Sequence, residues 1–131
     1  SALSDLADGT ATWLDDLFER ATPDLLFTHV PIDIPTARDY ILSLAPRRNM
    51  TKYVISSAPD LYPRYIKNRI PHVFTAHLHF PGDLHLDHTH FHLCTMSITM
   101  NDPNRSYSTM ATATIAEYRQ NAFTFHQIEV E

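Results

Sequence analysis

The hydrophobic pattern of this 131-residue chain changes its period partway along, and this change limits the folds open to it. In the first third, apolar residues recur every three or four positions, as they do on one face of a helix. This spacing predicts a helix over residues 3–18, kinked or broken at Gly9, and a second helix over residues 33–45. A short apolar run at residues 25–30 fits either a strand or a last helical turn.

From about residue 50 onward, the pattern is that of strands. Thr, Val, Ile, Phe, Tyr and His dominate short runs separated by turn signals, which is typical of β-structure. The last four runs are joined by short loops and predict an antiparallel meander. We therefore expect a single α+β domain spanning residues 1–131, with N-terminal helices packed on a strongly curved antiparallel sheet. The expected strands cover residues 53–57, 72–80, 85–100, 106–118 and 122–131.

Composition excludes several classes of function. The chain has only two glycines, so the glycine-rich phosphate loops of nucleotide-binding folds are absent. Its formal net charge is -5 and it has no basic stripe, which argues against nucleic-acid binding. The single cysteine, Cys94, fits a reducing compartment. No apolar run is long enough to span a membrane and no signal segment is visible, so we expect a cytoplasmic protein that does not bind membranes.

Seven of the nine histidines lie between positions 72 and 92, and three of them alternate along one predicted strand. On a strand, His88, His90 and His92 point to one face, with about 6.5–7 Å between neighbours. Neighbours such as His88 and His90 could share a metal ion. Gly82, five residues and His88-Thr89-His90 also copy the opening of a cupin metal motif, but the glutamate that should follow is missing. We therefore favour a polar face at a pocket mouth or subunit contact, with His90 as a proton carrier.

Three features together resemble the NTF2-like (SnoaL-like) family of α+β cones. They are the order of the elements, the helix start Pro35-Thr36-Ala37-Arg38, and the turn Tyr118-Arg119-Gln120-Asn121-Ala122-Phe123 before the last strand. The resemblance covers most of the chain. It implies either a small cofactor-free isomerase, cyclase, dehydratase or epoxide hydrolase, or a non-catalytic dimeric module. The branch it suggests includes isomerases of fungal meroterpenoid and indole-alkaloid pathways.

Two kinds of charged group are candidates for catalysis. Arg38 borders the apolar stripe of its predicted helix, so it is expected either to stabilise charge on a substrate oxygen or to pair with a carboxylate such as Asp39. In the last strand, Phe125, Gln127, Glu129 and Glu131 share one face. The family resemblance points to Glu129 or Glu131 as the general base. The alternative is that both carboxylates are simply solvated at the end of the chain.

These residues predict a cofactor-independent isomerase or cyclase that acts on a bulky natural-product intermediate, for example by a semipinacol-type shift. The alternative is a dimeric ligand- or protein-binding module, and a metal enzyme using His88 and His90 is less favoured. Because both faces of the predicted sheet carry apolar residues, we expect a homodimer formed through the outer sheet face. The residues expected to line the substrate pocket are Tyr53, Tyr65, His88, His92, Met96, Phe125 and Gln127.

Overall fold

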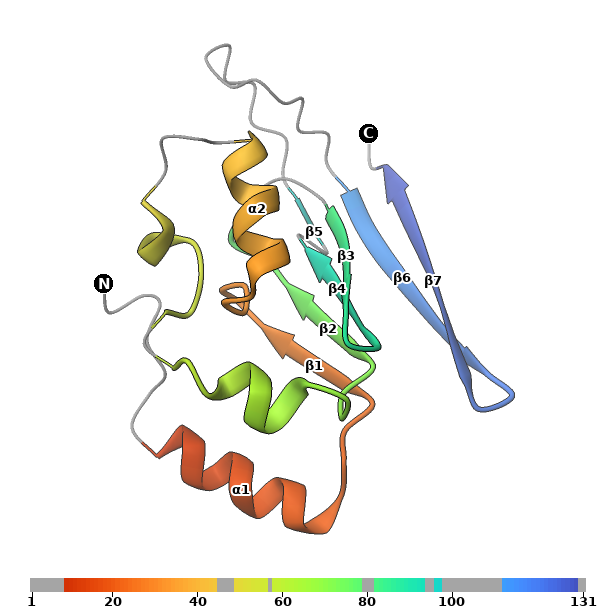
Figure 1. Cartoon of the computed structure of the whole chain (residues 1–131). Helices are drawn as coiled ribbons and strands as arrows, with labels where there is room; N and C mark the ends of the chain where they lie inside the picture. Colours follow the sequence, from red (N-terminus) through yellow and green to blue (C-terminus); the bar gives the residue numbers. More distant parts are fainter. Residues whose placement is uncertain are drawn as a thin grey trace.

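The computed structural model, drawn in Figure 1, has an α+β fold with helices and two separate sheets. It describes residues 9–44, 49–56, 58–78, 82–93, 96–97 and 112–129. Among these residues, no helix is both long and apolar enough to cross a membrane. The helical elements are α1 (Thr10–Arg20), α2 (Pro35–Leu44), the 3₁₀ turn η1 (Met50–Lys52) and the π-helical turn η2 (Tyr62–Ile66). The strands are β1 (Leu25–Thr28), β2 (His72–Thr75), β3 (Gly82–Leu86), β4 (Thr89–Leu93), β5 (Met96–Ser97), β6 (Thr112–Arg119) and β7 (Ala122–Glu129).

The helices follow the sequence pattern closely. Helix α1 begins directly after Gly9, whose φ of 82° is one that L side chains rarely adopt, and the part of the predicted helix before Gly9 lies outside the described residues. Helix α2 begins at Pro35, a residue that suits the first helical turn because its missing N–H would have no partner there. Its apolar stripe buries Ala37 and Ile41, and its bounds agree with the predicted helix over residues 33–45.

The first sheet is mixed and has the strand order β1-β2-β4-β3. Strand β2 lies between β1 and β4 and is parallel to both, whereas β3 pairs antiparallel with β4 at the edge. The predicted antiparallel meander is therefore wrong for this part of the chain. Beyond β2 the chain crosses to the sheet edge to form β3, and a tight turn then returns it as β4 beside β2.

Three predicted strands differ from the structure. The strand expected over residues 72–80 ends at Thr75 as β2, before His77 with its φ of 68°. The run over residues 85–100 is interrupted at Asp87 and His88, whose φ angles of 48° and 66° form a tight turn between β3 and β4. Such backbone angles cannot continue a strand. The run over residues 53–57 is not a strand either: the described part follows η1 and makes a single bridge between Ile32 and Ile55.

The second sheet has the order β5-β6-β7 and is dominated by a long hairpin. Strands β6 and β7 are antiparallel and joined at Gln120 and Asn121, which both have positive φ. Such a two-residue turn matches the twist of the strands, and it confirms the turn predicted before the last strand. The two sheets are separate, and the strongly curved NTF2-like cone stays a prediction.

The two faces of the first sheet differ in chemistry because side chains alternate along each strand. One face carries Val73, Phe91 and Leu93 into the core, where they join Ile41 of α2. At Gly82, the aromatic ring of Tyr40 lies 2.6 Å from where a Cβ would be, so a larger residue at this position would displace the Tyr40 side chain of α2. The opposite face carries histidines and faces the β6–β7 hairpin (Figure 1).

Candidate functional site

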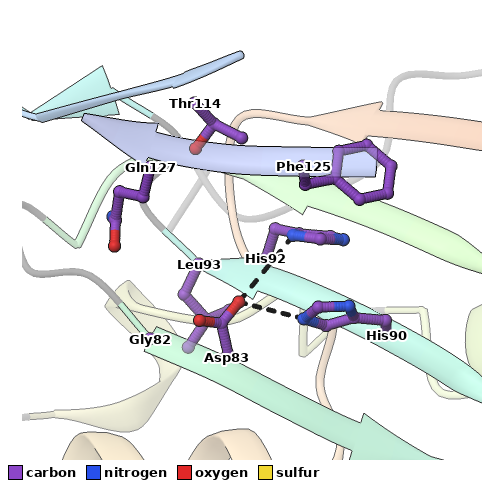
Figure 2. A pocket seen from close by; sticks show the side chains of 8 residues that line it. All are labelled: Gly82, Asp83, His90, His92, Leu93, Thr114, Phe125 and Gln127. Carbon is purple, nitrogen blue, oxygen red and sulfur yellow. Dashed lines mark hydrogen bonds and ion pairs between the residues drawn. The ribbon is translucent and has the colours of Figure 1, made fainter. Parts of the chain in front are cut away.

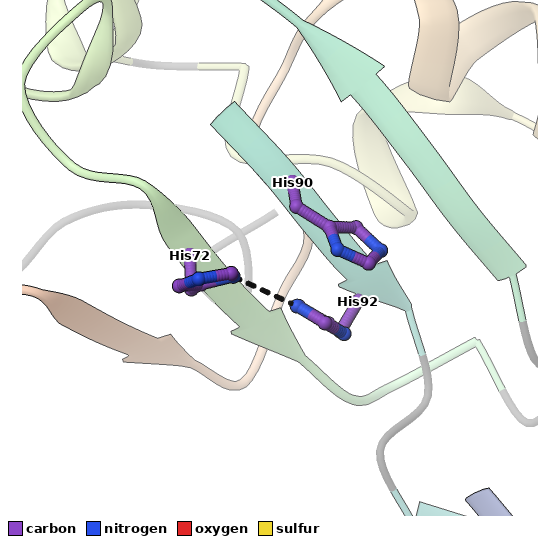
Figure 3. Close-up of side chains that lie close together, drawn as sticks. All are labelled: His72, His90 and His92. Atoms are coloured by element: carbon purple, nitrogen blue, oxygen red, sulfur yellow. Dashed lines mark hydrogen bonds between the residues drawn. The ribbon is translucent and has the colours of Figure 1, made fainter. Parts of the chain in front are cut away.

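Three histidines from two neighbouring strands converge on the polar face of the first sheet (Figure 3). His72 of β2 pairs in register with His90 of β4, and His92 follows two residues later on the same face. One ring nitrogen from each of the three lies within 4.8 Å of the other two. The Nδ1 atom of His72 is 3.3 Å from Nε2 of His92. We call these residues the histidine cluster.

Aromatic rings hold the histidine cluster in place. The rings of His90 and His92 stack with centroids 3.6 Å apart. Phe74 stacks on His92 at 4.2 Å with nearly parallel planes, so the ring of His92 is held between Phe74 and His90. From the hairpin, Phe125 contacts both His72 and His92, with centroid separations of 4.6 Å in each case. This packing fixes the ring positions without using their nitrogen atoms.

Asp83 of β3 contacts two of the three imidazoles (Figure 2). Its Oδ1 atom is 2.9 Å from Nε2 of His90 and 3.8 Å from Nδ1 of His92. The contact follows from the register, which places Asp83 directly opposite His92. The side chain of Asp83 is 66% exposed, so this carboxylate sits at the solvent edge of the site.

Burial keeps part of the histidine cluster neutral. The side chain of His92 is only 6% exposed, and its burial, together with the neighbouring His90 and His72, lowers its pKa to about 4. The pKa of His72 is also lowered, chiefly by burial and then by His90, while the charge of Asp24 opposes this effect. Both imidazoles therefore carry a free nitrogen lone pair at neutral pH, and a neutral imidazole is the form that binds metals.

A cavity of about 150 Å³ adjoins the histidine cluster on the side of Asp83 (Figure 2). Strands β3 and β4 supply one wall, and the β6–β7 hairpin supplies the other. At about 30 Å³ per water molecule, the space suits roughly five waters or one small molecule. The lining residues are Gly82, Asp83, His90, His92, Leu93, Thr114, Phe125 and Gln127.

Four of the residues predicted from sequence meet at this cavity. His90, His92, Phe125 and Gln127 come from two distant strands, and all four line it. His88 does not belong to this group, because it lies exposed in the β3–β4 turn with a φ of 66°. The prediction that His88, His90 and His92 share one strand face is therefore wrong, since the strand begins only at Thr89.

Other predicted residues lie elsewhere. Arg38 forms a bidentate salt bridge with Asp33. Its Nε donates to Oδ1 at 2.5 Å and its Nη2 donates to Oδ2 at 2.6 Å. The Arg38 side chain is 45% exposed and does not line the cavity, so it follows the alternative in which a carboxylate pairs it. The hydroxyl of Tyr65 donates to Asp15 beneath α1 at 2.7 Å, and the ring of Tyr53 lies 6.0 Å from that of His77.

The remaining predictions concern side chains outside the described part of the chain. Glu129 ends β7 and Met96 begins β5, but only their backbone positions are described. Glu131 lies beyond the described residues altogether. The predicted roles of Glu129 or Glu131 as a base and of Met96 as a pocket residue therefore stay predictions.

Two members of the site, His72 and Asp83, are not among the site residues predicted from the sequence. His72 belongs to the same histidine-rich segment as His90, but only the parallel pairing of β2 with β4 brings the two together. Asp83 falls between the strands expected over residues 72–80 and 85–100, whereas the structure places it inside β3. The excess of histidine between positions 72 and 92 was the one signal that pointed to the region.

Comparisons with profiles of protein families, with curated proteins and with solved structures found no match to this chain. The resemblance to the NTF2-like family thus rests on the sequence pattern alone.

Proposed function

We propose that this protein binds a divalent transition-metal ion, with Zn²⁺ as the expected ion, through His72, His90 and His92. The observation that carries the proposal is the convergence of one nitrogen from each histidine within 4.8 Å of the others. Imidazole nitrogen is a good ligand for zinc, copper, nickel and iron, whereas Ca²⁺ and Mg²⁺ prefer oxygen ligands. This set differs from the pair His88 and His90 considered from sequence, because His72 replaces His88 and His92 is added.

The spacing within the cluster supports the proposal. Zn–N bonds of about 2.0–2.1 Å at tetrahedral angles place two ligand nitrogens about 3.3–3.4 Å apart. The separation between Nδ1 of His72 and Nε2 of His92 is 3.3 Å. The three nitrogens lie within 4.8 Å of one another, so the rings must move closer together to bring all three to bonding distance of one ion.

Three protein ligands are the number that catalytic zinc sites use. Such a set leaves one coordination position for water or substrate, and the ion lowers the pKa of a bound water toward neutrality. Acting as a Lewis acid, the ion would give the site hydrolytic or hydration chemistry on a small substrate. The outer carboxylate of Asp83 fits this arrangement, since metal-binding histidines usually donate their other N–H group to such an acceptor.

A cobalt titration tests the proposal directly. The protein is purified without a metal-affinity column, treated with EDTA and titrated with Co²⁺. We expect visible absorption bands of four-coordinate cobalt that saturate at one ion per chain, are removed by equimolar Zn²⁺, and are unaffected by excess Mg²⁺. Failure to form these bands at millimolar Co²⁺ would refute the metal site.

The cofactor-free isomerase or cyclase is the second candidate, favoured by one specific observation. One cavity is lined by His90, His92, Phe125 and Gln127. Asp83, which pairs with His90, lines it too. It ranks second because Arg38 is bound to Asp33 away from this cavity, and because about 150 Å³ is small for a bulky intermediate.

The NTF2-like cone and the homodimer belong to this second proposal. The outer face of the hairpin exposes about half of Ile115 and 42% of Ile128.

Proton exchange tests this second candidate in the absence of metal. In D₂O with EDTA, the protein is expected to speed deuterium incorporation into a small ketone such as hydroxyacetone by about 100-fold over buffer. His90→Gln should abolish the effect, whereas His126→Gln, at an exposed position of β7, should not. Equal rates with and without protein would count against acid–base catalysis on small carbonyl compounds.

A further inference from the structure

We propose that Asp83 is a positioning residue that fixes the tautomers of His90 and His92, so that their unprotonated nitrogens face His72. The inference rests on the proposed metal site, because it says how that site is prepared before an ion arrives. A histidine ring has two nitrogens, and only the one without a proton can bind a metal. The choice between them is set by the hydrogen bond that the other nitrogen makes.

The first step is the hydrogen bond to His90. A carboxylate accepts hydrogen bonds and cannot donate one, so the Nε2 atom 2.9 Å from Oδ1 of Asp83 must carry the proton. In the neutral ring of His90, Nδ1 is then the nitrogen with the free lone pair. A metal ion can reach His90 only through that atom while the bond to Asp83 is kept.

The second step concerns His92. Its Nδ1 lies 3.8 Å from the same carboxylate oxygen, which is too long for a hydrogen bond but close enough for the negative charge to act on the ring. The negative charge favours the tautomer in which Nδ1 carries the proton. The lone pair is then on Nε2, which is the atom 3.3 Å from Nδ1 of His72.

The third step is the stacking of the two rings. With centroids 3.6 Å apart, the nitrogens of His90 and His92 that face Asp83 lie at one edge of the stack. Of the remaining nitrogens, Nε2 of His92 lies 3.3 Å from Nδ1 of His72, and one nitrogen of His90 lies within 4.8 Å of a nitrogen of each of these rings. By favouring a proton on the nitrogens beside it, the carboxylate of Asp83 leaves the lone pairs of His90 and His92 on their other nitrogens, which are available to a metal ion.

The exposure of Asp83 makes the proposal testable by substitution. Its side chain is 66% exposed, so replacing it leaves no buried cavity and the protein is expected to fold. Asp24 supplies a matched control, because its charge also acts on His72 and it too is exposed. A dependence on net charge alone would make the two carboxylates similar, whereas a positioning role, which needs a carboxylate beside Nε2 of His90 and Nδ1 of His92, is specific to Asp83.

The first measurement uses the metal-free protein and does not depend on metal binding. Long-range ¹H–¹⁵N correlation spectra report which ring nitrogen carries the proton. We expect the proton on Nε2 in His90 and on Nδ1 in His92, and we expect Asp83→Ala to abolish this fixed pattern while Asp24→Ala keeps it. The same tautomers in Asp83→Ala as in the wild-type protein would overturn the proposal.

The second measurement is the affinity for Co²⁺. Asp83→Ala is expected to weaken binding by about 10–100-fold, with partial recovery in Asp83→Glu and little change in Asp24→Ala. Equal weakening by Asp83→Ala and Asp24→Ala would show that only net charge matters, and it would overturn the positioning role. If the wild-type protein binds no Co²⁺ but shows the expected tautomers, the metal site fails while the effect of Asp83 on the rings stands.

Discussion

Replacing His92 by phenylalanine is expected to weaken Co²⁺ binding by more than about 100-fold, beyond the 10–100-fold typical of losing an outer partner. Phenylalanine keeps an aromatic ring between Phe74 and His90, so the stack is preserved while the nitrogen is lost. A loss of affinity in this variant therefore reports a missing ligand and not a collapsed site. Isothermal titration calorimetry of the EDTA-treated protein measures the effect.

Two other histidines serve as controls for this experiment. His126 lies on the exposed side of β7, and His126→Gln should leave the affinity unchanged. His88→Asn removes the imidazole that the sequence pattern placed beside His90, and asparagine tolerates the positive φ of the turn. Unchanged affinity in His92→Phe, or a loss in His88→Asn as large as in His92→Phe, would contradict the assignment of the ligands.

Replacing Phe91 by alanine is expected to lower the free energy of unfolding by about 3–5 kcal/mol, the usual cost of removing a buried aromatic ring. Phe91 is 1% exposed and sits on the central strand β4 between two residues of the histidine cluster. Its ring points into the core, where Tyr62 lies 6.1 Å away by ring centroids. Urea denaturation followed by circular dichroism measures the change.

Leu42 on α2 provides the comparison for this prediction. It is 42% exposed, so Leu42→Ala should cost under about 1 kcal/mol because little buried surface is lost. A cost for Phe91→Ala no larger than that for Leu42→Ala would mean that β4 is not packed on the core as described. The face assigned to His90 and His92 would then also be in doubt.

The local signals in the sequence predicted the elements that depend on local interactions. The start of α1 after Gly9, the bounds of α2 and the turn at Gln120 and Asn121 each follow from residues within a few positions. The spacing of apolar residues gave the class of fold as α+β for the same reason. Phe125 and Gln127 were also placed correctly together, because alternation along a single strand puts them on one face.

The local sequence signals did not predict how distant strands pair. Nothing within residues 72–93 indicates that β2 pairs parallel with β4 and that β3 lies at the edge. That order depends on which arrangement buries Val73 and Phe91 against the helices, and this is a property of the whole chain. The turn at Asp87 and His88 was missed because this pair is not a typical turn sequence.

Arg38 illustrates the same limit at a single side chain. The helical pattern predicted that Arg38 lies beside the apolar stripe of α2. It did not predict the partner of Arg38, which is Asp33 just ahead of the helix. The sequence by itself determined the helices, the strand-rich second half and a segment unusually rich in histidine. Only the tertiary structure decided that His72 joins His90 and His92 and that Asp83 lies beside them, because strand register is set by packing between distant segments.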